Sequence, residues 1–271
     1  FVLNLREPGL LRIFRLMLPA VVGLSATQIN IFINTFYASS CAQGSVSWLS
    51  YAYRLFHLPM GLFGVALMVA TLPVVSRHAA NHDLTALRAA VQSSLSLAIL
   101  VTLPAACGLI FLAQPIIGLI YQHGQFTALD TQQTAAALAL YSLGLVAFAG
   151  VKIIVPVYYA LDDTRIPVLG SFVTVAANLL IIHLTLAAMQ HRAIALSTSL
   201  SLMVNFFFLA AVLYRKLSGF KVGGLLLTFI KVAGASVIMG LAVSWLHPRA
   251  IAWLGSSLAG KALALAGVIG I

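Results

Sequence analysis

The sequence predicts an all-α protein of the membrane, a polytopic helix bundle with about eight transmembrane helices. Hydrophobic residues make up 62% of its 271 residues and charged residues only 7%, too few to cover the surface of a soluble domain of this size. The hydrophobic residues fall into runs of about 20, the length that crosses about 30 Å of hydrocarbon. A multi-pass membrane protein is therefore expected.

The predicted spans follow one another along the whole chain. They are residues 16–42, 47–73, 88–113, 128–151, 166–189, 192–214, 224–246 and 250–271. Residues 81–92 combine a helix start signal with helical periodicity, so the third span is expected to begin as a helix in the cytoplasm. Residues 115–123 are too short to cross and are typical of an interfacial or re-entrant piece.

Basic residues predict the orientation of these spans, because cytoplasmic loops collect lysine and arginine. Nine of them lie in the N-terminal segment and in alternate connections: Arg6, Arg12, Arg15, Arg77, Arg88, Arg165, Arg215, Lys216 and Lys221. The other connections hold only Arg192 and Arg249. Membrane topology thus explains the excess of basic residues, which are scattered singly rather than massed on one face, and no nucleic-acid partner is expected.

The second span carries the main candidate for a binding site. Arg54 and His57 are three residues apart and share a helix face, and none of the predicted spans offers an acid placed to neutralise them. A guanidinium presents a planar fork of donors that matches phosphate oxygens, so we expect an anionic, phosphate-bearing ligand. The alternatives are that Arg54 extends to the membrane surface and that His57 bonds a neighbouring carbonyl.

The first span is unusually polar, with Gln28 and Asn34 among its amides. Both are candidate substrate-binding residues, and hydrogen bonding between helices is the alternative. No Cys, His or acidic spacing matches a metal site, and no hydrolase or nucleotide-binding motif is present. The sequence therefore predicts no cofactor, no metal site and no catalytic residues, and the protein is not expected to be an enzyme.

Six stretches of the sequence carry a resemblance to a known family. They are MLPAVVGLSATQIN from Met17, INTFYAS from Ile33, GSVSWLSYAYRLFHLPMGLFGVAL from Gly44, YQHGQFTALDTQQ from Tyr121, YSLGL from Tyr141 and YALDDTRIPV from Tyr159. Together they resemble the MurJ (MviN) family of lipid II flippases, which belongs to the multidrug/oligosaccharidyl-lipid/polysaccharide (MOP) exporter superfamily. The resemblance covers residues 10 to about 215, and the remainder matches in hydropathy only.

The resemblance implies an architecture of fourteen helices, of which this chain would be helices seven to fourteen. Residues 1–15 would be an amphipathic segment on the cytoplasmic side, residues 16–217 the second six-helix lobe, and residues 218–271 two additional helices, the last one truncated. The chain is thus expected to be a fragment whose partners include an N-terminal lobe of the same protein. The two lobes of such exporters are related repeats that rock about a central cavity.

The resemblance also assigns roles to residues. Arg54 matches the family's cavity arginine in its eighth helix, which engages the diphosphate of lipid II. Some members bind sodium through acidic and amide groups on helices seven and eleven. Here Asn34 stands where an Asp is expected and Asn178 has no Asp nearby, so the sequence departs from that pattern.

The expected function is a flippase that moves the undecaprenyl-diphosphate-linked peptidoglycan precursor across the bacterial inner membrane for cell wall synthesis. Its expected partners are lipid II and membrane lipids. The alternative is a related exporter of another polyprenyl-linked glycan or of small molecules. An exporter of cationic drugs should show an acid within the membrane, and a membrane-embedded enzyme should show an acidic or metal-binding constellation; away from the span ends, neither is found in these spans.

Overall fold

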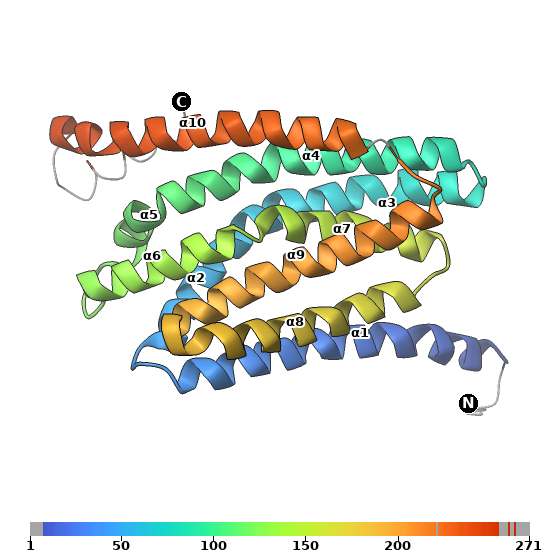
Figure 1. Ribbon diagram of the computed structural model, residues 1–271, viewed down its shortest axis with the longest axis horizontal. Coiled ribbons are helices and arrows are strands. Elements are labelled where there is room, and N and C mark those ends of the chain that lie inside the picture. Colours follow the sequence, from blue (N-terminus) through green and yellow to red (C-terminus); the bar gives the residue numbers. More distant parts are fainter. Residues whose placement is uncertain (1–7, 221, 255–259, 261–262, 264–271) are drawn as a thin grey trace, which may run out of the picture.

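The computed structural model of the chain is a bundle of helices (Figure 1). It describes residues 8–220, 222–254, 260 and 263, and for residues 8–20, 22, 24, 251, 253 and 254 it gives the helix backbone alone. All regular secondary structure in the described residues is helical. The all-α prediction is confirmed.

The helices are long and their connections are short. They are α1 (Pro8–Ser39), α2 (Ser45–Pro59), the π-helical segment η1 (Met60–Gly64), α3 (Val65–Ala80), α4 (Leu84–Phe111), α5 (Ala113–Tyr121), α6 (Ala128–Ser142), α7 (Leu145–Ala160), α8 (Arg165–Met189), α9 (His191–Lys216) and α10 (Val222–Leu254).

Within the described residues, five helical segments are long and apolar enough to cross a membrane, or six when the bent pair α6–α7 is taken as one span. They coincide with the second to seventh predicted spans. Helix α1 corresponds to the first predicted span and continues it back to Pro8, so residues 8–15 belong to the same helix. The eighth predicted span, 250–271, lies outside the described residues apart from its beginning and two single positions.

The helices are stacked side by side, with their connections gathered at two opposite ends of the bundle (Figure 1). Residues 40–44, 122–127 and Gln190 lie at one end, and residues 81–83, 161–164 and 217–220 at the other. Helices α4 and α10 pack together on one side and α1 and α8 on the opposite side, while α2, α3, α7 and α9 fill the middle. By the distribution of basic residues, the end with residues 81–83 is the predicted cytoplasmic one.

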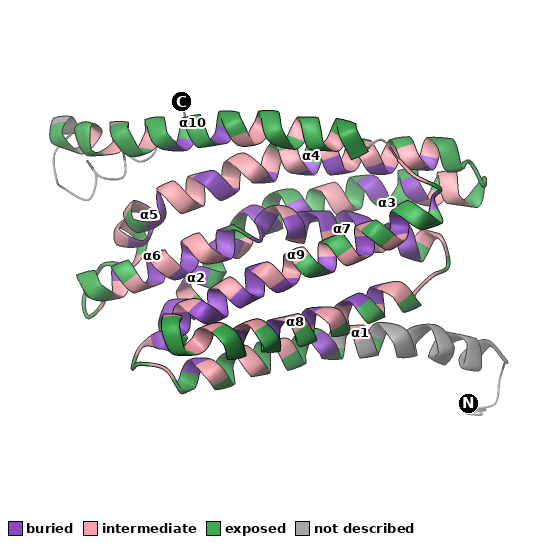
Figure 2. Ribbon diagram, viewed as in Figure 1, coloured by how far each residue is buried: buried purple, intermediate pink, exposed green. Residues whose placement is uncertain are grey.

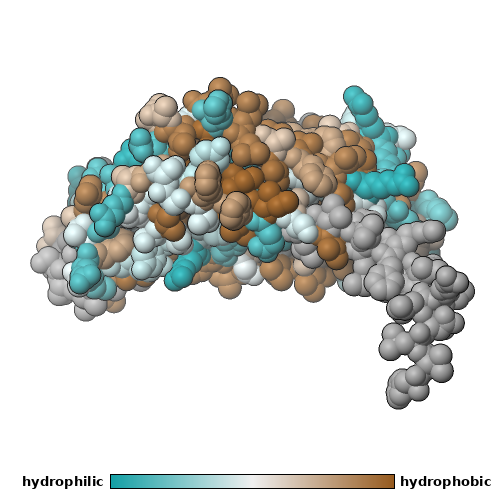
Figure 3. Space-filling view, turned by 90° about the horizontal axis from the view of Figure 1, so that it is seen from below, coloured by the Kyte–Doolittle hydropathy of each residue, from teal (hydrophilic) through white to brown (hydrophobic). Residues whose placement is uncertain are grey.

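Burial follows this arrangement (Figure 2). The inner helices supply most of the large, fully buried side chains, among them Phe56, Leu138, Ile153 and Tyr158. Helix α10 exposes most of its outward face, and a band of apolar side chains crosses the middle of the face seen in Figure 3, with hydrophilic atoms mainly toward its two ends. Apolar flanks with polar ends are what a hydrocarbon layer requires of a protein that spans it.

The helices α2, η1 and α3 form one continuous rod from Ser45 to Ala80. Pro59 lies inside it and lacks the backbone N–H of a normal helical residue, and the π-helical turn follows at once. A proline removes one hydrogen bond and crowds the preceding turn, so a locally widened turn relieves the conflict. Proline kinks are tolerated inside membrane helices when neighbouring helices cover them.

The α6–α7 span is bent by 42° at Leu143 and Gly144. Helix α9 crosses closely at this point, since a Cβ added at Gly144 would lie 2.9 Å from Ser199 Cα. The Ser199 hydroxyl donates to the carbonyl oxygens of Leu140 and Tyr141, at 2.6 and 2.9 Å. These carbonyls belong to the last turn of α6, where the regular i+4 donors run out, so the serine hydroxyl adds a donor that stabilises the break.

Side chains begin two of the helices as their sequences indicate. Asp83 accepts a hydrogen bond from the Ala86 backbone N–H at 3.0 Å and caps α4, which confirms a helical start within residues 81–92. Thr127 and Asp130 form a reciprocal capping box at the start of α6. Ahead of it, α5 is a short separate helix that covers most of the segment 115–123, predicted to be interfacial or re-entrant.

Helix α10 differs from the sequence-based expectation, which ends the seventh span at residue 246. It continues through His247, Pro248 and Arg249 to Leu254. The predicted turn is wrong because a proline keeps a helical φ and removes only one hydrogen bond, a loss that a long membrane helix absorbs.

Candidate functional site

A cavity of about 860 Å³ lies between α1, α2, α7, α8 and α9, near the middle of the bundle. This volume is within the range of small-molecule sites, about 300–1,000 Å³. Polar side chains of α1 and α8 face aromatic side chains of α2 and α7 across it. The cavity is therefore the candidate binding site, and two of the four predicted site residues, His57 and Asn34, line it.

The aromatic wall of the cavity is built around Phe148 of α7. His57 of α2 lies edge-on to this ring with centroids 5.8 Å apart, and Tyr53 lies 4.3 Å from His57. Tyr141, which is buried, contacts Tyr53 at 5.5 Å. Since α2 places a residue on this wall every three or four positions, its cavity face is set by helical periodicity.

His57 lines the cavity, as the sequence predicts for a residue of an inward face. Its ring is partly buried, and its Nε2 atom has no hydrogen-bond partner among the described residues. This nitrogen is itself shielded from solvent, so it is a buried polar atom without a partner, and a ligand reaches it only when the aromatic side chains around it move. The alternative from the sequence, a bond to a neighbouring carbonyl, is not formed by Nε2 here.

Arg54 is exposed and lies outside the set of residues that line the cavity. Its Cζ atom is 5.8 Å from the ring centroid of Tyr51, which in turn contacts Tyr121 and Phe126 at the nearer end of the bundle. No carboxylate is paired with Arg54 in the part of the chain that the structure describes. The guanidinium thus stands beside the cavity, on the neighbouring side of α2, and its binding role stays a prediction.

The two predicted amides of α1 lie in different places. Asn34 lines the cavity, donates to Thr198 Oγ1 at 3.1 Å and accepts from Asn178 Nδ2 at 2.8 Å. Asn178, fully buried on α8, also donates to Asn30 Oδ1 at 2.7 Å. Gln28 is exposed and does not line the cavity. Asn34 is therefore chiefly a link between α1, α8 and α9, as in the alternative reading of its sequence.

These amides do not fit the sodium site that some family members have. The cluster has no carboxylate to offset the charge of a cation, and the Oδ1 atoms of Asn30 and Asn34 both accept hydrogen bonds from Asn178. No group of three or more His, Cys, Asp or Glu side chains in the described chain is arranged to hold a metal ion. The donor set suits neutral hydrogen bonding between helices.

Lys152 is a cavity residue that the sequence analysis missed. It belongs to α7 and lines the cavity, with its Nζ atom 5.4 Å from the centroid of the Phe148 ring. The predicted span 128–151 left Lys152 at a membrane boundary, but the α6–α7 span continues to Ala160. The break at Gly144 bends the span without ending it, so the span is longer than the usual length of about 20 residues. In the sequence, the apolar run after Lys152 is the only signal that the span continues.

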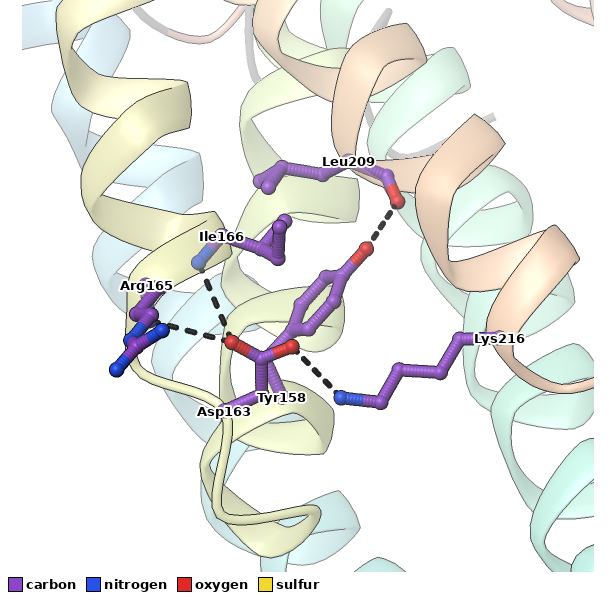
Figure 4. A network of polar contacts seen from close by, with 6 residues as sticks. All are labelled: Tyr158, Asp163, Arg165, Ile166, Leu209 and Lys216. Carbon is purple, nitrogen blue, oxygen red and sulfur yellow. Dashed lines mark hydrogen bonds and ion pairs between the residues drawn. The ribbon is translucent and has the colours of Figure 1, made fainter.

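The predicted cytoplasmic end of the bundle holds a different kind of polar cluster (Figure 4). Lys216 of α9 donates to Asp163 at 2.6 Å, and the other oxygen of Asp163 accepts from the backbone N–H groups of Arg165 and Ile166 at 3.2 and 3.4 Å. Beside them the buried Tyr158 hydroxyl donates to the Leu209 carbonyl at 2.7 Å. These bonds tie α7, α8 and α9 together.

The environment of Asp163 favours its charged form. Partial burial alone would raise the pKa of this carboxyl, but the hydrogen bond and charge of Lys216 and the two backbone N–H groups outweigh it and lower the pKa below its ordinary value of 3.8. The acid is therefore ionised at neutral pH and paired within the protein.

At the opposite end, Trp48 of α2 joins two neighbouring helices. Its Nε1 donates to Asp130 Oδ1 in the first turn of α6 at 2.7 Å, and its ring lies 5.0 Å from that of His191, at the start of α9. Asp130 is thus engaged both by this tryptophan and by its own capping box. It is not available to the cavity.

The bundle of long apolar helices defines the class, a polytopic helical membrane protein. The profile of the family described as lipid II flippase MurJ matches residues 1–262. The chain belongs to the MurJ lipid II flippase family. A probable lipid II flippase MurJ of Buchnera aphidicola is 38% identical over 208 residues, which cover 77% of this chain and 41% of the relative.

Solved structures agree with this fold. One described as lipid II flippase MurJ in an inward closed conformation matches with a TM-score of 0.74 at 24% identity, over 99% of this chain and 54% of that chain. An outward-facing multidrug resistance transporter of the MOP superfamily matches with a TM-score of 0.67 at 14% identity, over 94% of this chain and 62% of that chain. The chain spans about half the length of the curated relatives it matches.

Proposed function

We propose that this chain forms the second lobe of a lipid II flippase, which moves the undecaprenyl-diphosphate-linked peptidoglycan precursor across the bacterial inner membrane for cell wall synthesis. The observation that supports the proposal is the composition of the cavity in a member of this family. His57 and Lys152 line the cavity, and Arg54 lies beside it. Among the described residues, no acidic side chain lines it. Basic groups held at membrane depth without acids require an anion or water.

The headgroup of the substrate matches these groups. A diphosphate offers oxygens to the guanidinium fork of Arg54 and to the imidazole of His57. The polyprenyl tail stays among membrane lipids, because burying a long apolar chain in a polar cavity is unfavourable. Transport of this kind breaks no covalent bond, so the protein needs no catalytic residues.

Movement across the membrane requires a partner lobe. The relatives are about twice as long as this chain, and a first lobe facing the cavity would let the two lobes rock and expose it alternately to each side. The substrate shifts such an equilibrium only if the cavity groups bind it more tightly in one state than in the other. A related exporter of cationic small molecules is disfavoured, since a cation would meet the basic groups of this cavity.

Growth complementation with the full-length protein tests the proposal. In cells depleted of their own flippase, Arg54→Ala should abolish growth, and Arg54→Lys should restore it weakly because the planar fork is lost. Arg77→Ala, an exposed arginine in the last turn of α3 outside the cavity, serves as the control and should support normal growth. Normal growth with Arg54→Ala at normal protein levels would remove Arg54 from the binding site.

A further inference from the structure

We propose that Lys152 is a second binding point for the diphosphate, nearer the cytoplasmic end of the cavity than Arg54, so that the anion is passed from one cation to the other. This inference rests on the proposed function and adds a specific residue and an order of contacts. The observation behind it is that Lys152 and His57 both line the cavity and both contact the Phe148 ring, Lys152 Nζ at 5.4 Å from its centroid and the His57 ring at 5.8 Å.

The two cations lie at different depths in the bundle. Arg54 is nine residues from the start of α2 at Ser45, which is about 14 Å at 1.5 Å per residue, measured from the end that holds residues 40–44. Lys152 is eight residues before the end of α7 at Ala160, about 12 Å from the opposite end. His57 lies one turn below Arg54, between the two cations in depth.

Lys152 has no oppositely charged partner among the described residues. It is the one lysine or arginine among the residues that line the cavity within the described chain, and no acidic residue accompanies it there. Its side chain is exposed, and its described contact is with the face of Phe148, a weak attraction at an exposed site. Two turns of helix separate Lys152 from the end of α7, so its charge lies within the span and not at the end of the helix.

The chemistry of the pair suits a moving anion. A lysine is a compact charge on a flexible stem and binds phosphate without a fixed geometry, whereas an arginine binds phosphate oxygens as a planar fork. A diphosphate that enters from the cytoplasmic side would meet Lys152 first, then the imidazole of His57, and then Arg54 beside the outer part of the cavity. The looser contact precedes the more directional one.

Binding measurements on the full-length purified protein test whether Lys152 contacts the diphosphate. Lys152→Met removes the charge and keeps the length of the side chain, so lipid II binding should weaken about tenfold to a hundredfold, the effect of losing one charge-assisted hydrogen bond. Lys152→Arg should keep the affinity within about threefold because it restores the charge. Lys231→Met, an exposed lysine of α10 that does not line the cavity, is the matched control and should bind as wild type.

Inorganic pyrophosphate serves as a second probe and separates the diphosphate from the rest of lipid II. It should compete with lipid II in the wild type and lose that competition in Lys152→Met. If Lys152→Met binds lipid II as wild type does while Arg54→Ala binds weakly, the inference is overturned and the proposed function stands. If the wild type binds pyrophosphate through Lys152 but does not bind lipid II, the anion site stands and the proposed function falls.

Binding of neither probe by the wild type would overturn both. Thermal unfolding of each variant checks that a loss of binding is not a loss of folding. Should Lys152→Met fail to accumulate, Lys152→Gln takes its place with the same expected loss, and an affinity for lipid II equal to that of the wild type would contradict the inference.

Discussion

Lys216 and Lys152 occupy opposite settings in the same bundle. Lys216 lies at the end of α9 and is paired with Asp163, whose second oxygen is held by the first backbone N–H groups of α8. Lys152 lies inside the cavity, and within the described chain its contact is the ring of Phe148. The first charge is neutralised by the protein itself, and the second is left for something that enters.

This difference separates groups that hold the bundle together from groups available to a ligand. At the predicted cytoplasmic end, every member of the cluster in Figure 4 has a partner within the chain. In the cavity, His57 Nε2 lacks a partner among the described residues, and acids are missing from the lining that the structure describes. Unpaired polar groups at membrane depth cost free energy, so their retention indicates a function.

Reversal of charge gives the largest expected effect. Lys152→Glu would put an acid into the cavity, repel the diphosphate and abolish growth complementation. Lys216→Glu would instead place two acids side by side and lower the amount of folded protein, and the double change Lys216→Glu with Asp163→Lys should restore it. The measurements are growth and protein level in membranes. Normal growth with Lys152→Glu would show that the charge of Lys152 is not needed for transport and would contradict its role as a ligand-binding group.

Loss of the buried hydroxyl at the paired end gives an intermediate effect. Tyr158→Phe removes the bond to the Leu209 carbonyl, which should lower the free energy of unfolding by about 1 kcal/mol. Thermal unfolding in detergent measures this loss, and lipid II binding should stay at the wild-type level. A drop in binding with unchanged stability would show that this end takes part in recognition.

The smallest expected effect concerns pH. Because the pKa of Asp163 is lowered in the folded protein, its stabilising contribution is fully present above the ordinary pKa of 3.8 and is lost as pH falls through the lower folded pKa. An exposed ion pair contributes about 0–1 kcal/mol, so the change is small. Unfolding curves of the wild type and of Asp163→Asn should converge as the pH falls through this lowered pKa. Curves that keep the same separation at all pH values would contradict the pairing.

Much of the fold could be predicted because the periodicity and length of apolar runs are local properties. The second to seventh spans match helices of the structure, and Asp83 begins α4 as its position indicates. Interruptions without a polar signal were harder to foresee. The bend at Gly144 depends on Ser199 of α9, which is 55 residues away in the sequence. Its hydroxyl donates hydrogen bonds to carbonyl oxygens at the end of α6.

The candidate site could be predicted less completely. Helical spacing correctly puts His57 on the cavity wall, and it also puts Asn34 there, but the amide of Asn34 is already engaged by Asn178 and Thr198. Gln28 faces away from the cavity, and Lys152 enters it because α7 continues beyond the predicted boundary. Contacts between helices that are distant in the sequence decide which side chains face the cavity, and no local sequence pattern predicts those contacts.

The sequence by itself determined that this chain crosses a membrane many times as helices, since only intrachain hydrogen bonding satisfies a backbone in hydrocarbon and long apolar runs fit its thickness. It also determined the family and the scarcity of acids beside basic residues. The tertiary structure alone decided which basic group lines the cavity and which one pairs with an acid. A helix has several faces, and the packing of neighbouring helices decides which of them is covered.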